Sequence, residues 1–276
     1  MTAQIIALTV LVVGVGLPHG GLDHRFGRAL LRPALGWLWM PAFFTGYLTV
    51  MAVVLVGWWL APLLTLAGFV ALSAVHFGTA EADSDSSDGL FRTALFGGMV
   101  VWMPAFAQPA EFTQLLTWVV PGGHWPQDTL FRPAVRAGLA ALLAIAIPLA
   151  FATSLWRGMR VVGFATLFAI LPPLVSFLIY FCLWHSGVEL YRLARRANPQ
   201  NVWLGLARVA REAFPLASVS ALIIAVAWWA GATDLPLTHG LVRAIFVGLS
   251  VVAVPHLLLH WATARRDVNP FSEVDP

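Results

Sequence analysis

The chain alternates between long apolar runs and short polar breaks. Several long stretches carry no ionised side chain, among them residues 1–22, 34–75, 137–156, 161–184 and 213–233. A helix rises ~1.5 Å per residue, so about 20 apolar residues cross the hydrocarbon core of a bilayer. Backbone polar groups in lipid must be paired within the chain, which favours helices. The pattern therefore predicts an all-α protein, a polytopic transmembrane helical bundle of roughly 7–9 spans.

The apolar pattern can be divided into individual spans. The candidates are residues 1–22, 34–60, 62–79, 93–108, 137–156, 161–190, 213–232 and 241–262. The first run lacks a basic start and ends in PHGGLDH, so we expect a span rather than a cleaved signal peptide. Because no internal repeat divides the chain, we expect residues 1–276 to form a single integral membrane helical domain. These features predict a multi-pass protein of the cell inner (plasma) membrane.

Arginine clusters indicate the orientation of the chain. The arginine-rich segments are residues 25–32, 192–211 and 265–266. The positive-inside rule places all of them on the cytoplasmic side, which simple alternation of the candidate spans does not allow. Either residues 112–127 form an additional crossing, or residues 161–190 bend back at Pro172-Pro173. We therefore expect an odd number of spans with the N-terminus outside.

Composition narrows the chemistry. Hydrophobic residues make up 59% and charged residues 11% of the chain, against ~45–50% and ~25% in an ordinary globular protein. All 16 basic side chains are arginine, so a lysine Schiff base, including lysine-bound retinal, is excluded. The single Cys182 excludes an intramolecular disulfide and a thiolate zinc cluster. A scattered net charge of +3 does not suggest a nucleic-acid partner.

Four histidines lie in or at the ends of apolar runs: His19, His76, His185 and His256. A polar ring at membrane depth is costly unless it is paired, so function is the first expectation. For any one of them, an interhelical hydrogen bond is an equally good explanation. On separate segments, however, these rings are expected at a similar depth in one half of the bilayer. Neutral imidazole binds Fe, Cu, Zn and Ni, and we expect the four to enclose one metal.

Carboxylates accompany these histidines. Asp23 follows His19, Glu81 follows His76, and Glu189 lies one helical turn after His185 on the same face. Carboxylates beside ligating imidazoles fix the tautomer and raise ligand basicity. We therefore assign Asp23 and Glu81 catalytic roles through the imidazoles, although a solvated helix end explains either equally well. Glu189 is close enough in sequence to chelate the same metal as His185.

Four other histidines are weaker candidates: His24, His124, His239 and His260. His124 and His239 lie in predicted loops, where a solvated ring is expected. His260 lies one turn after His256 and could pair with it on a metal, but its place beside Trp261 favours an interfacial role. Gly20 and Gly21, directly after His19, permit a close backbone approach at that point.

The motifs around the histidines resemble those of the Brp/Blh family of bacterial and archaeal membrane β-carotene 15,15′-dioxygenases. The matching stretches are GLPHGGLDH at 16–24, HFGTAE at 76–81, YFCLWHSGVEL at 180–190 and VPHLLLH at 254–260. They occur in the family's order, and the combination is more specific than any single motif. The resemblance covers essentially the whole chain.

The resemblance implies oxidative cleavage of the central double bond of β-carotene with O2, giving retinal. It also implies non-haem Fe(2+), with His19, His76 and His185 as ligands. The family pattern has a further histidine one turn after the third, where this chain has Glu189. The fourth ligand is then either Glu189 or His256.

The expected substrate is a carotenoid that enters from the bilayer lipids. Large aromatic side chains near the motifs are expected to line its cavity: Phe77, Trp102, Phe181 and Trp184. The product retinal could be handed over to a rhodopsin. Two other classes of protein also place histidines in apolar spans, namely a bis-histidine haem protein for electron transfer and a proton-relaying transporter. A haem protein would show a Soret band, and a transporter would need neither iron nor O2.

Overall fold

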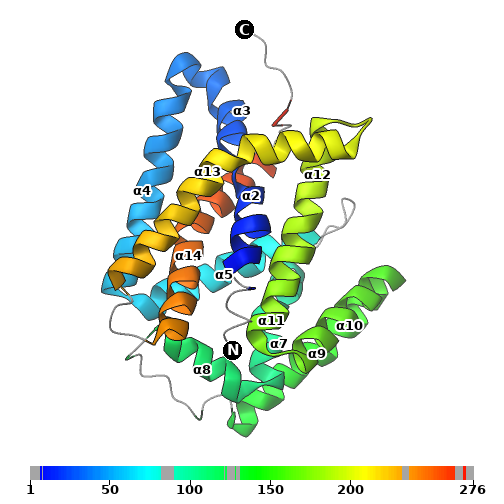
Figure 1. Ribbon diagram of the computed structural model, residues 1–276. Coiled ribbons are helices and arrows are strands. Elements are labelled where there is room, and N and C mark those ends of the chain that lie inside the picture. The colour runs from blue at the N-terminus through cyan, green and yellow to red at the C-terminus, as the bar shows by residue number, and fades with distance from the viewer. Residues whose placement is uncertain are drawn as a thin grey trace. The chain divides into compact units, whose positions relative to one another are not determined.

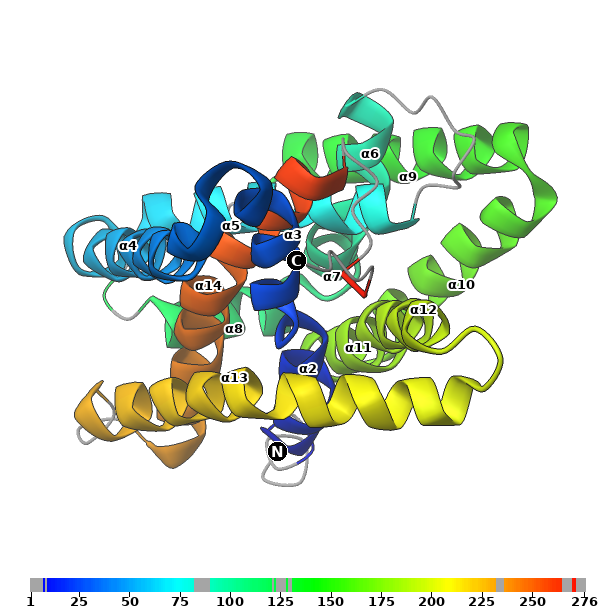
Figure 2. The same ribbon diagram turned by 90° about the horizontal axis from the view of Figure 1, so that it is seen from above.

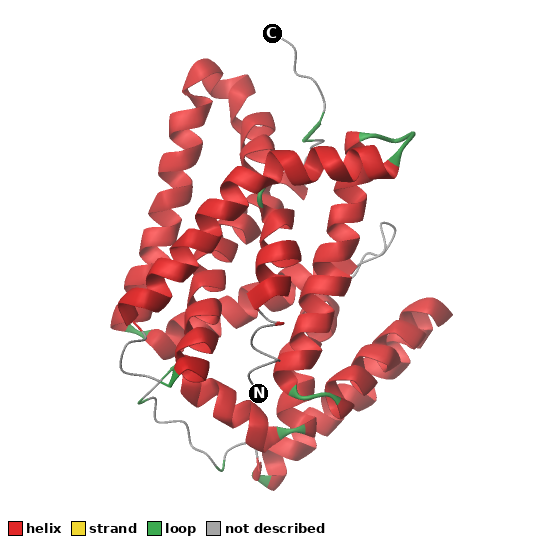
Figure 3. Ribbon diagram, viewed as in Figure 1, coloured by secondary structure: helices red, strands yellow, loops and turns green. Residues whose placement is uncertain are grey.

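The computed structural model describes residues 7, 9–81, 90–120, 122, 128, 131–231, 236–264 and 270–271. Across these residues the regular structure is helical, without a strand (Figure 3). A helix pairs its backbone groups internally, which an apolar run in lipid requires. The prediction of an all-α protein is confirmed.

The chain forms two compact units, Met1–Thr65 with Phe181–Pro276, and Leu66–Tyr180. Figure 1 labels helices of both units. The helices of the first unit are η1 (Val12–Gly16), α2 (Leu17–Gly20), α3 (Asp23–Leu35), η2 (Gly36–Leu38), α4 (Trp39–Leu60), α12 (Gly187–Ala197), α13 (Val202–Gly231) and α14 (Leu237–Ala264). The second unit holds most of α5 (Pro62–Glu81), and α6 (Leu90–Gly97), α7 (Met99–Ala107), α8 (Pro109–Val119), α9 (Pro133–Thr153), α10 (Leu155–Ile170) and α11 (Pro173–Leu178). The π-helix η4 (Ile179–Ser186) joins the units. A single domain over the whole chain stays a prediction.

Six helical runs in the described part are long and apolar enough to cross a membrane: Thr9–Leu60, Pro62–Ala80, Pro133–Thr153, Pro173–Ala197, Val202–Val226 and His239–Thr263. The first has 52 residues and would measure about 78 Å if straight. Gly36 interrupts it with a φ of 54°, a conformation that a side chain disfavours. As a result α3 and α4 fold back against each other (Figure 1). This run therefore includes residues 9–22 of the first predicted span and all of the span predicted at 34–60.

Two predicted spans are interrupted in the structure. Residues 93–108 are divided at Gly98 between α6 and α7, which have 8 and 9 residues. Each of these helices is about 12–14 Å long, too short to cross a bilayer alone. Residues 161–190 break where expected, because α10 ends at Ile170 and α11 begins only at Pro173. The alternative crossing at 112–127 includes most of α8, which has 11 residues, and residues that lie outside the described part of the structure. The orientation and the number of crossings stay predictions.

The first unit is organised around α13 and α14. Helix α13 packs against α2, α12 and α14, while α14 also packs against α3 and α4 (Figure 2). The expected close approach after His19 occurs at Gly21, where a Cβ atom would lie 2.6 Å from the carbonyl oxygen of Ala213 on α13. Any larger residue at position 21 would push α13 away from His19.

A residue from the polar C-terminal segment completes the core of this unit. Phe271 is only 9% exposed, in a cluster with Leu22, Phe26, Leu193, Val209 and Ala213. The guanidinium groups of Arg25 and Arg208 lie 5.2 and 5.3 Å from its ring centroid. Arg25 also donates to the carbonyl oxygen of Pro270 at 3.3 Å. The segment is therefore held by both apolar and cation–π contacts.

Candidate metal centre

Irregular helix geometry marks the positions of three buried histidines. His19 follows the π-helix η1 and Pro18, and His185 lies within the π-helix η4. His256 directly follows Pro255 inside α14. Proline and π-helical turns disturb the regular hydrogen-bond ladder, and π-helical turns are frequent at functional sites. In each case the histidine lies at or directly after a proline or a π-helical turn, where regular α-helical hydrogen bonding is interrupted.

The three histidine rings come together in the first unit. The ring centroids of His19 and His185 are 5.6 Å apart, and those of His19 and His256 are 5.1 Å apart. Both pairs are almost perpendicular, at 90° and 89°. The exposed fractions of His19, His185 and His256 are 8%, 5% and 5%. Three of the four predicted imidazoles thus converge in a buried cluster.

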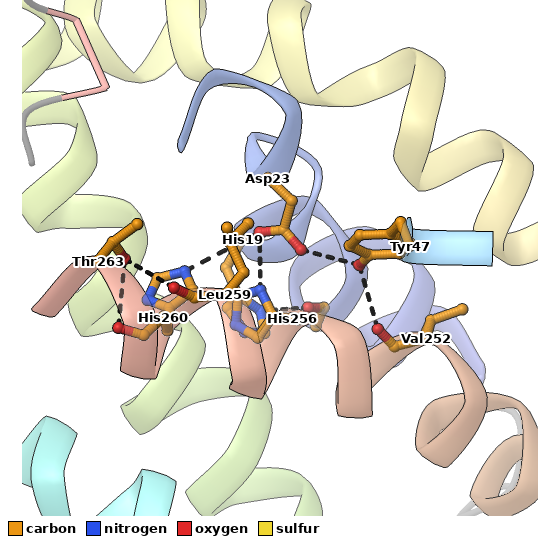
Figure 4. A network of polar contacts seen from close by, with 9 residues as sticks. His19, Asp23, Tyr47, Val252, His256, Leu259, His260 and Thr263 are labelled. Carbon is orange, nitrogen blue, oxygen red and sulfur yellow. Dashed lines mark hydrogen bonds and ion pairs between the residues drawn. The ribbon is translucent and has the colours of Figure 1, made fainter. Parts of the chain in front are cut away.

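Hydrogen bonds turn the Nδ1 atoms of two of these rings toward the protein. His19 Nδ1 contacts the carbonyl oxygen of Gly16, one turn earlier. His256 Nδ1 lies 2.8 Å from Asp23 Oδ1 (Figure 4). An acceptor at Nδ1 places the ring proton there and leaves the lone pair on Nε2. This is the tautomer that a histidine uses when it ligates a metal through Nε2.

Asp23 connects His256 with a side chain from α4. The carboxylate is 2% exposed, and its Oδ2 accepts a hydrogen bond of 2.8 Å from the hydroxyl of Tyr47. Nε2 of His260 lies 3.9 Å from Oδ1. The contacts around the carboxylate therefore come from α4 and α14 (Figure 4).

His260 lies beside the cluster, and the interfacial role suggested by its neighbour Trp261 stays a prediction. Its ring centroid is 4.2 Å from that of His256 and 4.9 Å from that of Phe26. Asp23, His256 and His260 offer ligand atoms within 4.8 Å of one another, so they too could hold a metal ion. His260 lies next to His256 because residues one turn apart on a helix face the same side.

The buried donor set fits a transition metal. Imidazole nitrogen suits Fe, Cu, Zn and Ni, and helix-borne side chains projecting inward are the usual way in which a bundle holds such ions. His256 belongs both to the three-ring cluster and to the group with Asp23. Since Asp23 is already at hydrogen-bond distance from Nδ1 of His256, it is better suited to orienting this ring than to replacing it as a ligand.

The other predicted ligands and carboxylates are Glu189, His76 and Glu81. Glu189 belongs to the same unit as the ring cluster, where its charge interacts with His19 and His260. Glu189 is half-buried on α12, with Oε2 3.5 Å from Nη1 of Arg192. His76 belongs to α5 in the second unit, where its ring centroid is 5.9 Å from that of Phe77. Glu81 ends α5, and its side chain lies outside the described part of the structure. The ligand roles of His76 and Glu189 and the catalytic role of Glu81 stay predictions.

One of the predicted aromatic residues touches the ring cluster within the first unit. Phe181 is stacked on His185, with a centroid distance of 6.2 Å, and meets His19 edge-on at 6.0 Å. Trp184 is half-buried in η4, one position before His185. In the second unit, Phe77 packs against Tyr180, and Trp102 donates to the Leu95 carbonyl oxygen at 2.9 Å. Their contact with a substrate stays a prediction.

Tyr47 is the site residue that sequence reasoning missed. It is the one tyrosine in the charge-free stretch that forms α4. A phenol hydroxyl at membrane depth requires a hydrogen-bond partner, as a buried imidazole does. That requirement is the signal by which the sequence could have pointed to it.

The chain is similar to known proteins over most of its length. Residues 10–262 match the family model described as beta-carotene 15,15'-dioxygenase. The chain is 27% identical to the "Probable beta-carotene 15,15'-dioxygenase Blh" of Halobacterium salinarum, over 93% of this chain and 83% of that protein. It is 25% identical to the "Beta-carotene 15,15'-dioxygenase" of an uncultured marine bacterium, 66A03, over 90% of each. No solved structure gives a significant match.

Proposed function

The chain belongs to the β-carotene 15,15′-dioxygenase family, and we propose that it cleaves the central 15,15′ double bond of β-carotene, or of a related carotenoid, with O2. Each carbon of that bond receives one oxygen atom as the bond between them breaks. The products are two aldehydes, which for β-carotene are both retinal. Both named relatives carry the name of this activity.

The observation that carries the proposal is the convergence of three buried imidazoles, His19, His185 and His256. We propose that they hold Fe(2+) through nitrogen, with His76 and Glu189 as further candidate ligands. When bound, the ion supplies the redox chemistry that activation of O2 requires, for which zinc would not serve. The donor set of neutral imidazoles is suited to this ion.

The protein's own contribution is to hold these rings in one tautomer and away from water. The carbonyl oxygen of Gly16 and the carboxylate of Asp23 keep a proton on Nδ1 of His19 and His256. The lone pair of each ring then lies on Nε2, the atom that would ligate the ion. Phe181 packs on two of the rings and excludes water from that side.

The substrate is proposed to reach the site from the lipid. A carotenoid is dissolved in the bilayer, and the helical runs on which the histidines lie are long and apolar enough to cross it. We propose Phe77, Trp102, Phe181 and Trp184 as cavity walls and Glu81 as a carboxylate supporting His76. The proposed membrane is the cell inner (plasma) membrane, from which retinal can pass to a rhodopsin.

Expression of the chain in carotenoid-producing cells tests the function directly. Loss of the pigment colour and accumulation of retinal, identified by chromatography and mass, are the expected results. Accumulation of shorter or longer apocarotenoid aldehydes would instead show cleavage at another double bond. Retained pigment, with the protein present in the membrane and loaded with iron, would contradict the proposal.

A further inference from the structure

The hydroxyl of Tyr47 is positioned to control the orientation of the Asp23 carboxylate. It lies 2.8 Å from Oδ2 of Asp23 and 3.2 Å from the carbonyl oxygen of Val252 on α14 (Figure 4). A phenol has one proton to donate, and an ionised carboxylate is the stronger acceptor. The hydrogen bond to Asp23 is therefore the dominant one.

The two oxygens of Asp23 have different partners. Oδ2 accepts from Tyr47 on α4, and Oδ1 faces Nδ1 of His256 on α14 at 2.8 Å. Rotation of the carboxylate group would break both contacts together. At 2% exposure, bulk water cannot replace either partner. Fixing one oxygen thus fixes the direction in which the other accepts.

A second hydrogen bond in the same helix pair does not involve this carboxylate. Trp58 Nε1 on α4 donates to the hydroxyl of Ser250 on α14 at 2.6 Å, and both side chains are buried. It joins the same two helices as the Tyr47 contact with Val252. The contribution of Tyr47 to helix packing can therefore be separated from its contribution to Asp23.

We propose that Tyr47 is a positioning residue of the metal centre, whose hydroxyl holds Asp23 as the acceptor that directs Nε2 of His256 toward the ion. This inference rests on the proposed function, because it requires His256 to be a ligand. Tyr47 on α4 would then orient Asp23 on α3, and Asp23 would orient the ligand His256 on α14. Partners of this kind change metal affinity about 10–100-fold when removed.

The test measures metal affinity without catalysis. Purified metal-free full-length protein in detergent is titrated with Co²⁺, whose visible absorption reports the bound ion. Tyr47→Phe removes one hydroxyl and is expected to raise the Kd about tenfold, the lower end of that range. Ser250→Ala removes one hydroxyl from the same helix pair, and its Kd is expected to stay within about twofold. An equal Kd for Tyr47→Phe and wild type would overturn the inference.

A double-mutant cycle tests whether Tyr47 acts through Asp23. In an Asp23→Asn background, Tyr47→Phe is expected to cause no further change in Kd. An undiminished tenfold effect in that background would show that Tyr47 acts independently and would overturn the inference. If wild-type protein shows no binding of Co²⁺, the proposed metal centre itself fails, which is a different outcome.

If the Tyr47→Phe protein does not accumulate, NMR spectroscopy of the native Tyr47 side chain tests the same inference. The chain has three tyrosines, so Tyr180→Phe with Tyr191→Phe leaves Tyr47 as the one ring carrying a ζ-¹³C label. Addition of Zn²⁺ is expected to shift its resonance, because the ion, His256 and Asp23 are linked to the hydroxyl. A resonance that does not move on saturation with Zn²⁺ would overturn the inference.

Discussion

Nδ1 of His256 lies 2.8 Å from Oδ1 of Asp23, although 233 positions separate the two residues in the chain. The contact joins α14 to the first turn of α3 inside a cluster of buried imidazoles. A carboxylate in this position holds the histidine in one tautomer, in addition to joining the two helices. The arrangement leads to predictions about both the metal and the packing around it.

Replacing Asp23 by asparagine should weaken the metal centre. The amide keeps the shape of the side chain but is a poorer acceptor for the ring N–H of His256. We expect a 10–100-fold loss of metal affinity or of retinal formation, measured by metal analysis and product chromatography on the same preparation. Metal content and activity equal to wild type would contradict the orienting role of this carboxylate.

Each of the three clustered histidines should be required for metal binding. His19→Ala, His185→Ala and His256→Ala are expected to lose at least ~100-fold in affinity, since a ligand matters more than its outer partner. His239→Ala is the matched control, because position 239 is on the same helix as His256 but roughly 25 Å away along its axis. If His239→Ala loses as much metal as His256→Ala, the histidines are acting through folding and not as ligands.

The two candidates for the fourth ligand differ in their contacts. His256 is in ring contact with His19, whereas the carboxylate of Glu189 lies 3.5 Å from the guanidinium of Arg192. Glu189→Ala is therefore expected to lower metal affinity less than His256→Ala does, as measured by equilibrium dialysis. A larger loss of affinity in Glu189→Ala than in His256→Ala would make Glu189 the stronger ligand. Glu189→His should then bind the metal more tightly than Glu189→Ala does.

Removal of the metal should abolish retinal formation reversibly. Treatment with a chelator is expected to give inactive protein, with activity returning on addition of Fe²⁺ but not of Zn²⁺. The absorption spectrum of the active preparation should lack a Soret band. A Soret band proportional to activity would indicate bis-histidine haem instead.

Gly21→Ala should destabilise the first unit. The added Cβ would lie 2.6 Å from the carbonyl oxygen of Ala213, so α13 must shift. Overpacking of this kind costs ~1–3 kcal/mol, which a thermal unfolding assay in detergent would detect. Gly138→Ala is the control, because its Cβ would meet nothing within 4 Å. Equal unfolding temperatures for the two variants would show that the contact at Gly21 relaxes without cost.

Much of the fold and part of the site follow from the sequence because lipid imposes strict rules. Charge-free runs must be helical, and a polar ring within them must have a partner, which points to His19, His185 and His256. The number of helices long enough to cross was harder to predict. Gly36 and Gly98 act through local backbone geometry, which apolar composition does not reveal.

Contacts between segments distant in sequence were the part that could not be predicted. The role of Tyr47 depends on α4 meeting α3 and α14, and no spacing in the sequence encodes this meeting. His260 lies in VPHLLLH, where a neighbouring tryptophan suggested an interface. Its place beside Asp23 depends on how α14 packs against α3, which the sequence does not reveal.

The burial of Phe271 makes residues near the C-terminus part of the packing beside the metal centre. Its ring shares a cluster with Phe26, whose own ring lies 4.9 Å from that of His260. A polypeptide cut after Ala264 would leave Phe26 and Leu22 uncovered and remove a partner from two arginines. A purification tag is therefore better placed away from Phe271, so that this packing beside His260 is kept.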